Sequence, residues 1–105
     1  MDDNVVPMKM RPATALRMIR KLAADSDRIV IVNHAAKRQR ERSITRKQIE
    51  FCMQSGFIAE GPFMNDFGNW QVTLCCRHAG DELTCVVAID WPSQLIVITT
   101  IRRKP

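Results

Sequence analysis

Residues 69–89 of the chain are NWQVTLCCRHAGDELTCVVAI, and this stretch decides the fold. Apolar and polar residues alternate through its first half, which predicts a β-strand over 69–77 with one face buried. A second strand is predicted over 82–89. A loop of residues 78–81 sets Arg77 opposite Glu82 and gathers the apolar residues on one face, whereas a slip by one residue destroys both features. The face predicted to be buried carries Trp70, Val72, Leu74, Cys76, Leu83, Cys85, Val87 and Ile89, and the other carries Gln71, Thr73, Cys75 and Arg77.

Three further strands are predicted around this hairpin, over residues 28–32, 57–60 and 95–101. The first is rich in β-branched residues and is expected to be buried on both faces. In the last, residues of both parities are apolar, so the sequence leaves open whether Arg102 or Arg103 shares a face with Gln71. Residues 61–68 are rich in Gly, Pro, Asn and Asp and are expected to form a loop.

Helices are predicted before most of the sheet. Residues 12–24 carry an apolar stripe with basic residues outside it, which is typical of an amphipathic helix. Asn33 is expected to cap a second helix over 34–42, and the capping-box pair Thr45 and Gln48 opens a third that ends at Gly56. The predicted fold is α+β, with the N-terminal helices packed on one face of a mostly antiparallel sheet. Residues 12–105 form one domain, and residues 1–11 are expected to be a flexible arm.

The chain is basic, and its charge is unevenly placed. Among 105 residues, 16 are Lys or Arg and 11 are Asp or Glu, which gives a formal charge of +5. The basic residues concentrate in residues 8–21 and 34–47, in the half that is predicted to be helical. Such runs are solvated helix faces or surfaces for an anionic partner, either nucleic acid or an acidic protein.

The ends and the cysteines indicate a cytoplasmic protein without a metal. The chain opens Met1, Asp2, Asp3 with no apolar run after it, and no apolar stretch is long enough to span a membrane. The four cysteines are therefore expected to be reduced. Cys75 and Cys85 fall on opposite faces of the predicted hairpin, so no three of the Cys75, Cys76, His78 and Cys85 side chains converge on one ion. No metal or other cofactor is expected.

One group of side chains fits the chemistry of RNA cleavage without a metal. That reaction needs a base for the 2′-hydroxyl, a cation for the phosphate and an acid for the leaving oxygen. His34 starts the second helix and is followed at a spacing of four by Arg38 and Arg42, which places the three along one helix face. The catalytic candidates are Gln71, Arg102 and His34, and the candidates for binding RNA phosphates are Arg38, Arg42, Arg77 and Arg103. His34 also fits a surface or capping histidine.

The stretch Asn33-His34-Ala35-Ala36-Lys37-Arg38-Gln39-Arg40-Glu41-Arg42-Ser43-Ile44-Thr45, then a helix, Gly56, a sheet and the closing Ile96-Val97-Ile98-Thr99-Thr100, resembles a bacterial domain family of unknown function. This resemblance covers about residues 28 to 103, and the family is grouped with the RelE/ParE-like toxins. Ser43 stands where that family has Gly.

The chain also resembles, more distantly, the MqsR family of mRNA-cleaving toxins. Asn69-Trp70-Gln71 is similar to its Trp-Gln strand, and Ile101-Arg102 to its terminal Phe-Lys. The resemblance implies functional roles for Gln71 and Arg102. The functional Tyr of that family falls near Thr84, and its other Lys has no counterpart near Gly61, so half of the implied site is absent.

Three readings follow from these observations. The first is a metal-independent, toxin-like endoribonuclease of a toxin–antitoxin module, with mRNA as substrate and a cognate antitoxin as partner. The second is a non-catalytic domain of the same fold that binds nucleic acid or an acidic protein, and the missing Tyr and Lys favour it. A plain dimerising module is a third reading, because Val86, Ala88 and part of residues 95–101 leave apolar side chains on the face of the sheet that no helix is expected to cover.

Overall fold

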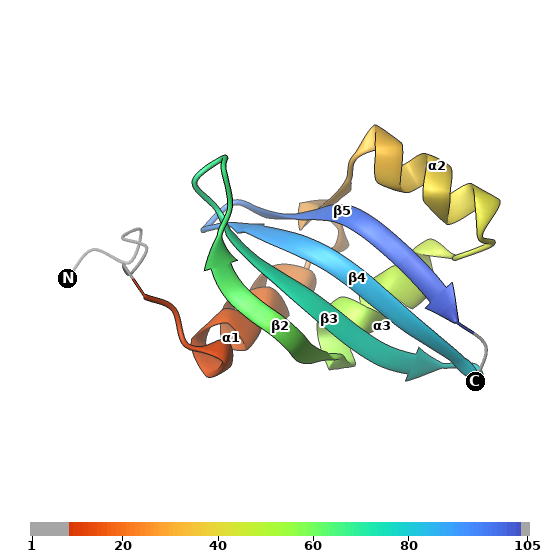
Figure 1. The fold of residues 1–105 in the computed structure, drawn as a ribbon, viewed down its shortest axis with the longest axis horizontal. Coiled ribbons are helices and arrows are strands. Elements are labelled where there is room, and N and C mark those ends of the chain that lie inside the picture. Colours follow the sequence, from red (N-terminus) through yellow and green to blue (C-terminus); the bar gives the residue numbers. More distant parts are fainter. Residues whose placement is uncertain (1–8, 104–105) are drawn as a thin grey trace.

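The computed structural model describes residues 9–103, and it has the predicted α+β class (Figure 1). One five-stranded sheet is combined with three α-helices and a short 3-10 helix in this part of the chain. The elements in chain order are α1 (Pro12–Ala23), η1 (Ser26–Arg28), β1 (Ile29–Ile31), α2 (Asn33–Glu41), α3 (Arg46–Ser55), β2 (Phe57–Met64), β3 (Trp70–His78), β4 (Asp81–Asp90) and β5 (Gln94–Arg103).

The strands lie in the order β1-β5-β4-β3-β2, and only the β1–β5 pair is parallel. The predicted register of the β3–β4 hairpin is confirmed, because Trp70 pairs with Ile89 and Arg77 with Glu82. The turn is tighter than the predicted four residues. His78 and Asp81 still pair, and Ala79 and Gly80 alone form the turn with φ angles of 53° and 83°, as in a two-residue hairpin turn.

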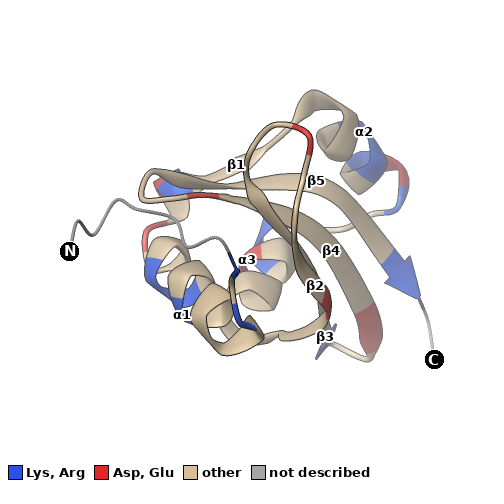
Figure 2. Cartoon of the chain, turned by 60° about the vertical axis from the view of Figure 1, so that its left-hand side comes forward, with Lys and Arg blue, Asp and Glu red and all other residues tan. Residues whose placement is uncertain are grey.

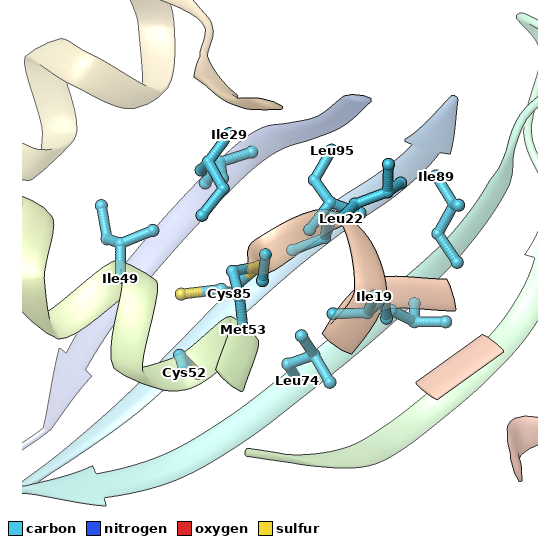
Figure 3. Close-up of a cluster of buried hydrophobic side chains, with 14 of the residues drawn as sticks. Ile19, Leu22, Ile29, Ile49, Cys52, Met53, Leu74, Cys85, Ile89 and Leu95 are labelled. Atoms are coloured by element: carbon cyan, nitrogen blue, oxygen red, sulfur yellow. The ribbon is translucent and has the colours of Figure 1, made fainter. Parts of the chain in front are cut away.

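The core lies between the sheet and the two helices α1 and α3 (Figure 3). Ile19 of α1 and Ile49 and Met53 of α3 are fully buried against the apolar face of the hairpin. The predicted capping box of α3 is confirmed, with Gln48 N donating to Thr45 Oγ1 at 3.1 Å and Thr45 N donating to Gln48 Oε1 at 2.9 Å. Burial of this face supplies the main stabilisation of the domain.

The helix α2 is separate from this layer and packs along β5, at the opposite side of the sheet from β2 (Figure 1). Val32 N donates to Val97 O at 3.3 Å, and the helix starts directly afterwards with Val32 as its N-cap. The prediction that Asn33 caps α2 is therefore wrong, because the backbone stays bonded to β5 up to Val32 and Asn33 is already helical. Ala35 is fully buried at this contact.

Two strand predictions need correction. The strand β1 is not buried on both faces, since Ile29 is buried but Val30 is 38% exposed. The strand β2 continues to Met64, into the segment predicted to be a loop. Two register shifts between Ile58 and Phe63 accommodate the Gly61 and Pro62 positions, so the strand bends without ending.

A β-bulge in β5 decides which arginine faces which side of the sheet. Val87 pairs with Val97 but Val86 pairs with Thr99, so Ile98 is an extra residue. Beyond the bulge the side-chain parity is reversed. Arg103 pairs with Glu82 and shares the face of Gln71, whereas Arg102 pairs with the buried Leu83 on the helix-covered face. We call the sheet surface opposite α1 and α3 the open face.

Most of the predicted arm over 1–11 lies outside the described residues, and Met10, within them, is 7% exposed and packs in the core. No helix within residues 9–103 combines the length and the apolar character that crossing a membrane requires.

Candidate functional site

Five arginines hold the fold together by donating to backbone carbonyl oxygens. Arg20 is the most connected, with Nη1 to Met53 O at 2.7 Å and Nη2 to Gly56 O at 2.6 Å. These two bonds satisfy carbonyl groups at the end of α3 that have no partner within the helix. The others are Arg28 (to Pro92 O and Ser93 O), Arg42 (to Thr100 O), Arg46 (to Ser26 O and Ile29 O) and Arg102 (to Ser43 O). Part of the positive charge of the chain therefore serves to hold the fold together.

The exposed side of α2 carries cations that the fold does not use in this way. Lys37 and Arg38 lie 4.0 Å and 3.6 Å from the single carboxylate of Glu41. Arg40 makes no side-chain hydrogen bond or ion pair with another residue of 9–103, and the same is true of Arg103 at the end of β5. Figure 2 shows these basic positions on α2 and at the end of β5, and a second basic group on α1.

The end of α2 and the end of β5 are held next to each other. Arg42, which follows α2, donates to Thr100 O, and Arg102 Nη1 donates to Ser43 O at 3.3 Å. We call Lys37, Arg38, Arg40 and Arg103 the α2 basic surface. Three of these four cations fall within four consecutive residues, so the local positive charge is dense.

The predicted line of His34, Arg38 and Arg42 is only partly available to a ligand. His34 and Arg38 are exposed in α2. Arg42 is half-buried, and its guanidinium is bonded to Thr100 O. A spacing of four places residues on one helix face, but it does not show that the last of them is engaged by a neighbouring strand.

The sheet residues predicted to act together lie at two ends of the open face. Gln71 is near the β2–β3 loop, and Arg77 is six positions further along β3, which is about 20 Å in an extended strand. Arg77 Nη2 forms an ion pair with Glu82 Oε1 at 3.0 Å, and Arg103 is the β5 partner of the same Glu82. Arg77 and Arg103 are thus brought together, and Gln71 is not with them.

Gln71 and Arg102 are on opposite faces of the sheet. Arg102 Nε lies 3.8 Å from Asp81 Oδ2, at the end of the sheet where the β3–β4 turn is. Their partners on β4, Ala88 and Leu83, are five positions apart, or about 17 Å. The structure therefore does not bring together Gln71, Arg102 and His34.

The β2–β3 loop bends over the open face and borders a hollow that the sequence did not predict. Two strands, β3 and β4, separate β2 from β5, about 14 Å at usual strand spacing. Nevertheless Phe67 and Asn69 of the loop line the same hollow as residues of β5. We call this space of about 430 Å³ the loop hollow; its other lining residues include Val32, Ala88, Ile96 and Ile98.

A second hollow of about 320 Å³ adjoins the first and contains Gln71. Phe67 and Ile98 line both spaces, and we call the second the Gln71 hollow; Phe63, Met64 and Asp66 also line it. Gln71 Oε1 accepts a hydrogen bond from Asn65 Nδ2 at 3.2 Å. Two phenylalanines, Phe63 and Phe67, within a segment rich in Gly, Asn and Asp are the sequence signal from which this feature could have been predicted.

Three of the four cysteines are packing groups of the core. Cys52, Cys76 and Cys85 are buried on the helix side of the sheet, and Cys75 lies on the open face. The hydrogen bond to Cys85, together with burial, raises the pKa of the Cys52 thiol, and burial raises the pKa of Cys76 to about 12. Within residues 9–103 no group of three or more His, Cys, Asp or Glu is placed to hold a metal ion.

Comparison with known proteins places the chain in a family. A family model described as "Domain of unknown function (DUF4258)" matches residues 31–102, which is more than half of the chain. The match includes α2, α3 and the four antiparallel strands, and so both hollows and nearly all of the α2 basic surface. No curated protein and no solved structure matches. The chain therefore belongs to the family of domains of unknown function DUF4258.

Proposed function

We propose that this domain binds RNA through the α2 basic surface. The observation that carries the proposal is that the cations fall into two groups, those bonded to the backbone and those left exposed. Five arginines are engaged by backbone carbonyls, while Lys37, Arg38 and Arg40 on α2 and Arg103 at the end of β5 remain exposed. Exposed guanidinium and ammonium groups bind phosphates and release counterions from a nucleic acid. The resemblance to RNA-cleaving toxins supports RNA as the anionic partner.

Binding is measured by fluorescence anisotropy with a labelled single-stranded RNA of about 12 nucleotides, over a range of salt concentrations. We expect the double variant Lys37→Gln/Arg40→Gln to bind about tenfold more weakly at low salt and to reduce the slope of log K against log salt by about 1.4, since two phosphate contacts are lost. The matched control is Arg17→Gln/Lys47→Gln, which removes the same charge from exposed positions of α1 and α3. An equal loss in both variants would show that net charge alone drives binding and would overturn the proposal.

Toxin-type cleavage is the competing proposal, and a cognate antitoxin belongs to it. General acid and base groups act within about 3 Å of the reacting atoms, but Gln71 and Arg102 lie on opposite faces of the sheet, about 17 Å apart along it. We therefore expect bound RNA to stay intact on a denaturing gel in the presence of EDTA. Cleavage that persists in EDTA and is lost in Gln71→Ala or Arg102→Ala would instead establish the endoribonuclease.

A further inference from the structure

We infer that the loop hollow and the Gln71 hollow receive two neighbouring unpaired bases of a single-stranded RNA, with the ring of Phe67 stacked against them. This inference rests on the proposed RNA binding and adds to it a substrate class and a second contact surface. It predicts that the strand must be single, because the bases of a duplex are already stacked on each other and paired.

The first observation is the exposure of Phe67. Its side chain is 90% exposed, the highest value among the large hydrophobic residues of 9–103. Two further exposed large hydrophobics, Phe63 and Met64 of β2, line the Gln71 hollow together with Phe67. Exposed apolar side chains that gather in one place mark a surface for binding.

The second observation is that the loop is fixed although its tip is exposed. Asn65 Oδ1 accepts hydrogen bonds from Phe67 N and from Asn69 N, each at 3.0 Å. Asn65 N donates to Asn69 O at 2.9 Å, and Gly68 N donates to Asn65 O at 3.1 Å. The backbone that carries Phe67 is thereby held before any ligand arrives, which lowers the entropy cost of binding.

The third observation is the position of the ring between two spaces. Phe67 and Ile98 line both hollows, so a planar group on either side contacts one aromatic ring and an apolar sheet surface. Base stacking on aromatic side chains tolerates any base because every base has a π face. An aromatic ring that borders two adjoining hollows is therefore suited to a dinucleotide step of any sequence.

The fourth observation is the polar groups at the rims. With Gln71 Oε1 bonded to Asn65, Gln71 Nε2 keeps both N–H donors available, and the Asn69 amide has no side-chain hydrogen bond within residues 9–103. Amide donors suit the carbonyl oxygens and ring nitrogens of unpaired bases. The exposed carboxylate of Asp66 at the Gln71 hollow suits an exocyclic amino group.

The positive charge next to the hollows favours RNA over an apolar protein segment as the ligand. Val32 lines the loop hollow and is the N-cap of α2, so α2 starts at the edge of this hollow. An RNA strand whose bases occupy the hollows can therefore continue along α2 onto the α2 basic surface. Cations beside an aromatic platform are the usual combination of sites for single strands. A second copy of this chain would bring the same positive charge against this surface.

The test uses the anisotropy assay above with variants at one position. Phe67→Ala should weaken binding about tenfold and leave the salt slope unchanged, since a stacking contact and no phosphate contact is lost. Phe67→Leu should be nearly as weak, because an apolar side chain without a ring does not stack, and Phe67→Trp should bind at least as tightly as the wild type. Phe57→Ala is the matched control. The Phe57 ring is 62% exposed on the same sheet, but its β3 partner is Cys75, away from the hollows. Its replacement should change the affinity for RNA less than about twofold.

A second readout follows the base itself. An RNA that contains 2-aminopurine should lose fluorescence on binding the wild type, since stacking quenches this base, and should keep it on binding Phe67→Ala. Unchanged affinity and quenching in Phe67→Ala would overturn base stacking and leave the α2 basic surface intact. Wild-type affinity in Phe67→Leu, or a concentration-dependent dimer that Phe67→Ala abolishes, would overturn it in favour of a protein partner. If the α2 variants bind normally and Phe67→Ala does not, the proposed phosphate surface fails and the base site stands.

Discussion

Replacement of Arg20 by Met is expected to lower the free energy of unfolding by about 3 kcal/mol. The guanidinium joins α1 to the end of α3 through its bonds to Met53 O and Gly56 O, at 2.7 and 2.6 Å. Both bonds are partly buried, and each charge-assisted hydrogen bond is worth about 1.5 to 3 kcal/mol. Met fills a similar volume, so the loss comes from two carbonyl groups left without donors and only slightly from packing.

The measurement is urea unfolding followed by circular dichroism, and the control is Arg17→Met. Arg17 lies one turn earlier on the same helix and is exposed. Its replacement should change the free energy of unfolding by no more than about 0.5 kcal/mol. If Arg20→Met were as mild as the control, the two helices would be held by apolar packing alone, and the arginine bonds would have no net worth.

Replacement of Gly56 by Ala should have an effect of similar size, about 3 kcal/mol, for a steric reason. Gly56 ends α3 with an ordinary φ of −73°, so its backbone does not demand glycine. A Cβ at this position, however, would lie 2.5 Å from Cys52 O and 2.9 Å from Cys75 O. Both are backbone atoms, so α3 would have to move away from β3.

Gly68→Ala is the comparison that separates this collision from backbone strain. Gly68 has a φ of +82°, and a Cβ there meets nothing within 4 Å. Its replacement should cost only the left-handed backbone penalty, about 1 kcal/mol. Equal losses at the two glycines in urea unfolding would mean that the contact between α3 and β3 adapts easily, contrary to the close approach seen here.

The sequence predicts those parts of the fold that depend on local pattern. Alternation of side chains and the Arg77–Glu82 pair determine the register of the central hairpin, and the Thr45 and Gln48 side chains determine the start of α3. Gly56 was correctly predicted as the end of α3. The usual preference for glycine at a helix end is not the reason for it here, because its φ is ordinary and the carbonyl of Cys75 approaches it from β3.

The parts that escaped prediction depend on contacts between distant segments. A single extra residue, Ile98, turns Arg103 to the open face and Arg102 away from it, and nothing in the apolar run 95–101 marks that position. Gln71 and Arg102 were assigned to one site by the chemistry of RNA cleavage and by resemblance, and neither reveals the bulge that puts them on opposite faces. The engagement of Arg42 by Thr100 O likewise needs the α2–β5 contact to be known.

The position of α2 along β5 also affects how other molecules can reach the edge of the sheet. A strand at the edge of a sheet presents free N–H and C=O groups on which a foreign chain can add as a further strand, and this is a common route to aggregation. Here β1 pairs with the first part of β5, and α2 with Arg42 covers the next part. At the other edge, β2 is broken by two register shifts and contains Pro62, which has no N–H to donate. Neither edge of the sheet offers a long template for strand addition. A macromolecule is therefore expected to bind this domain through side chains on its surface and not through the sheet edges.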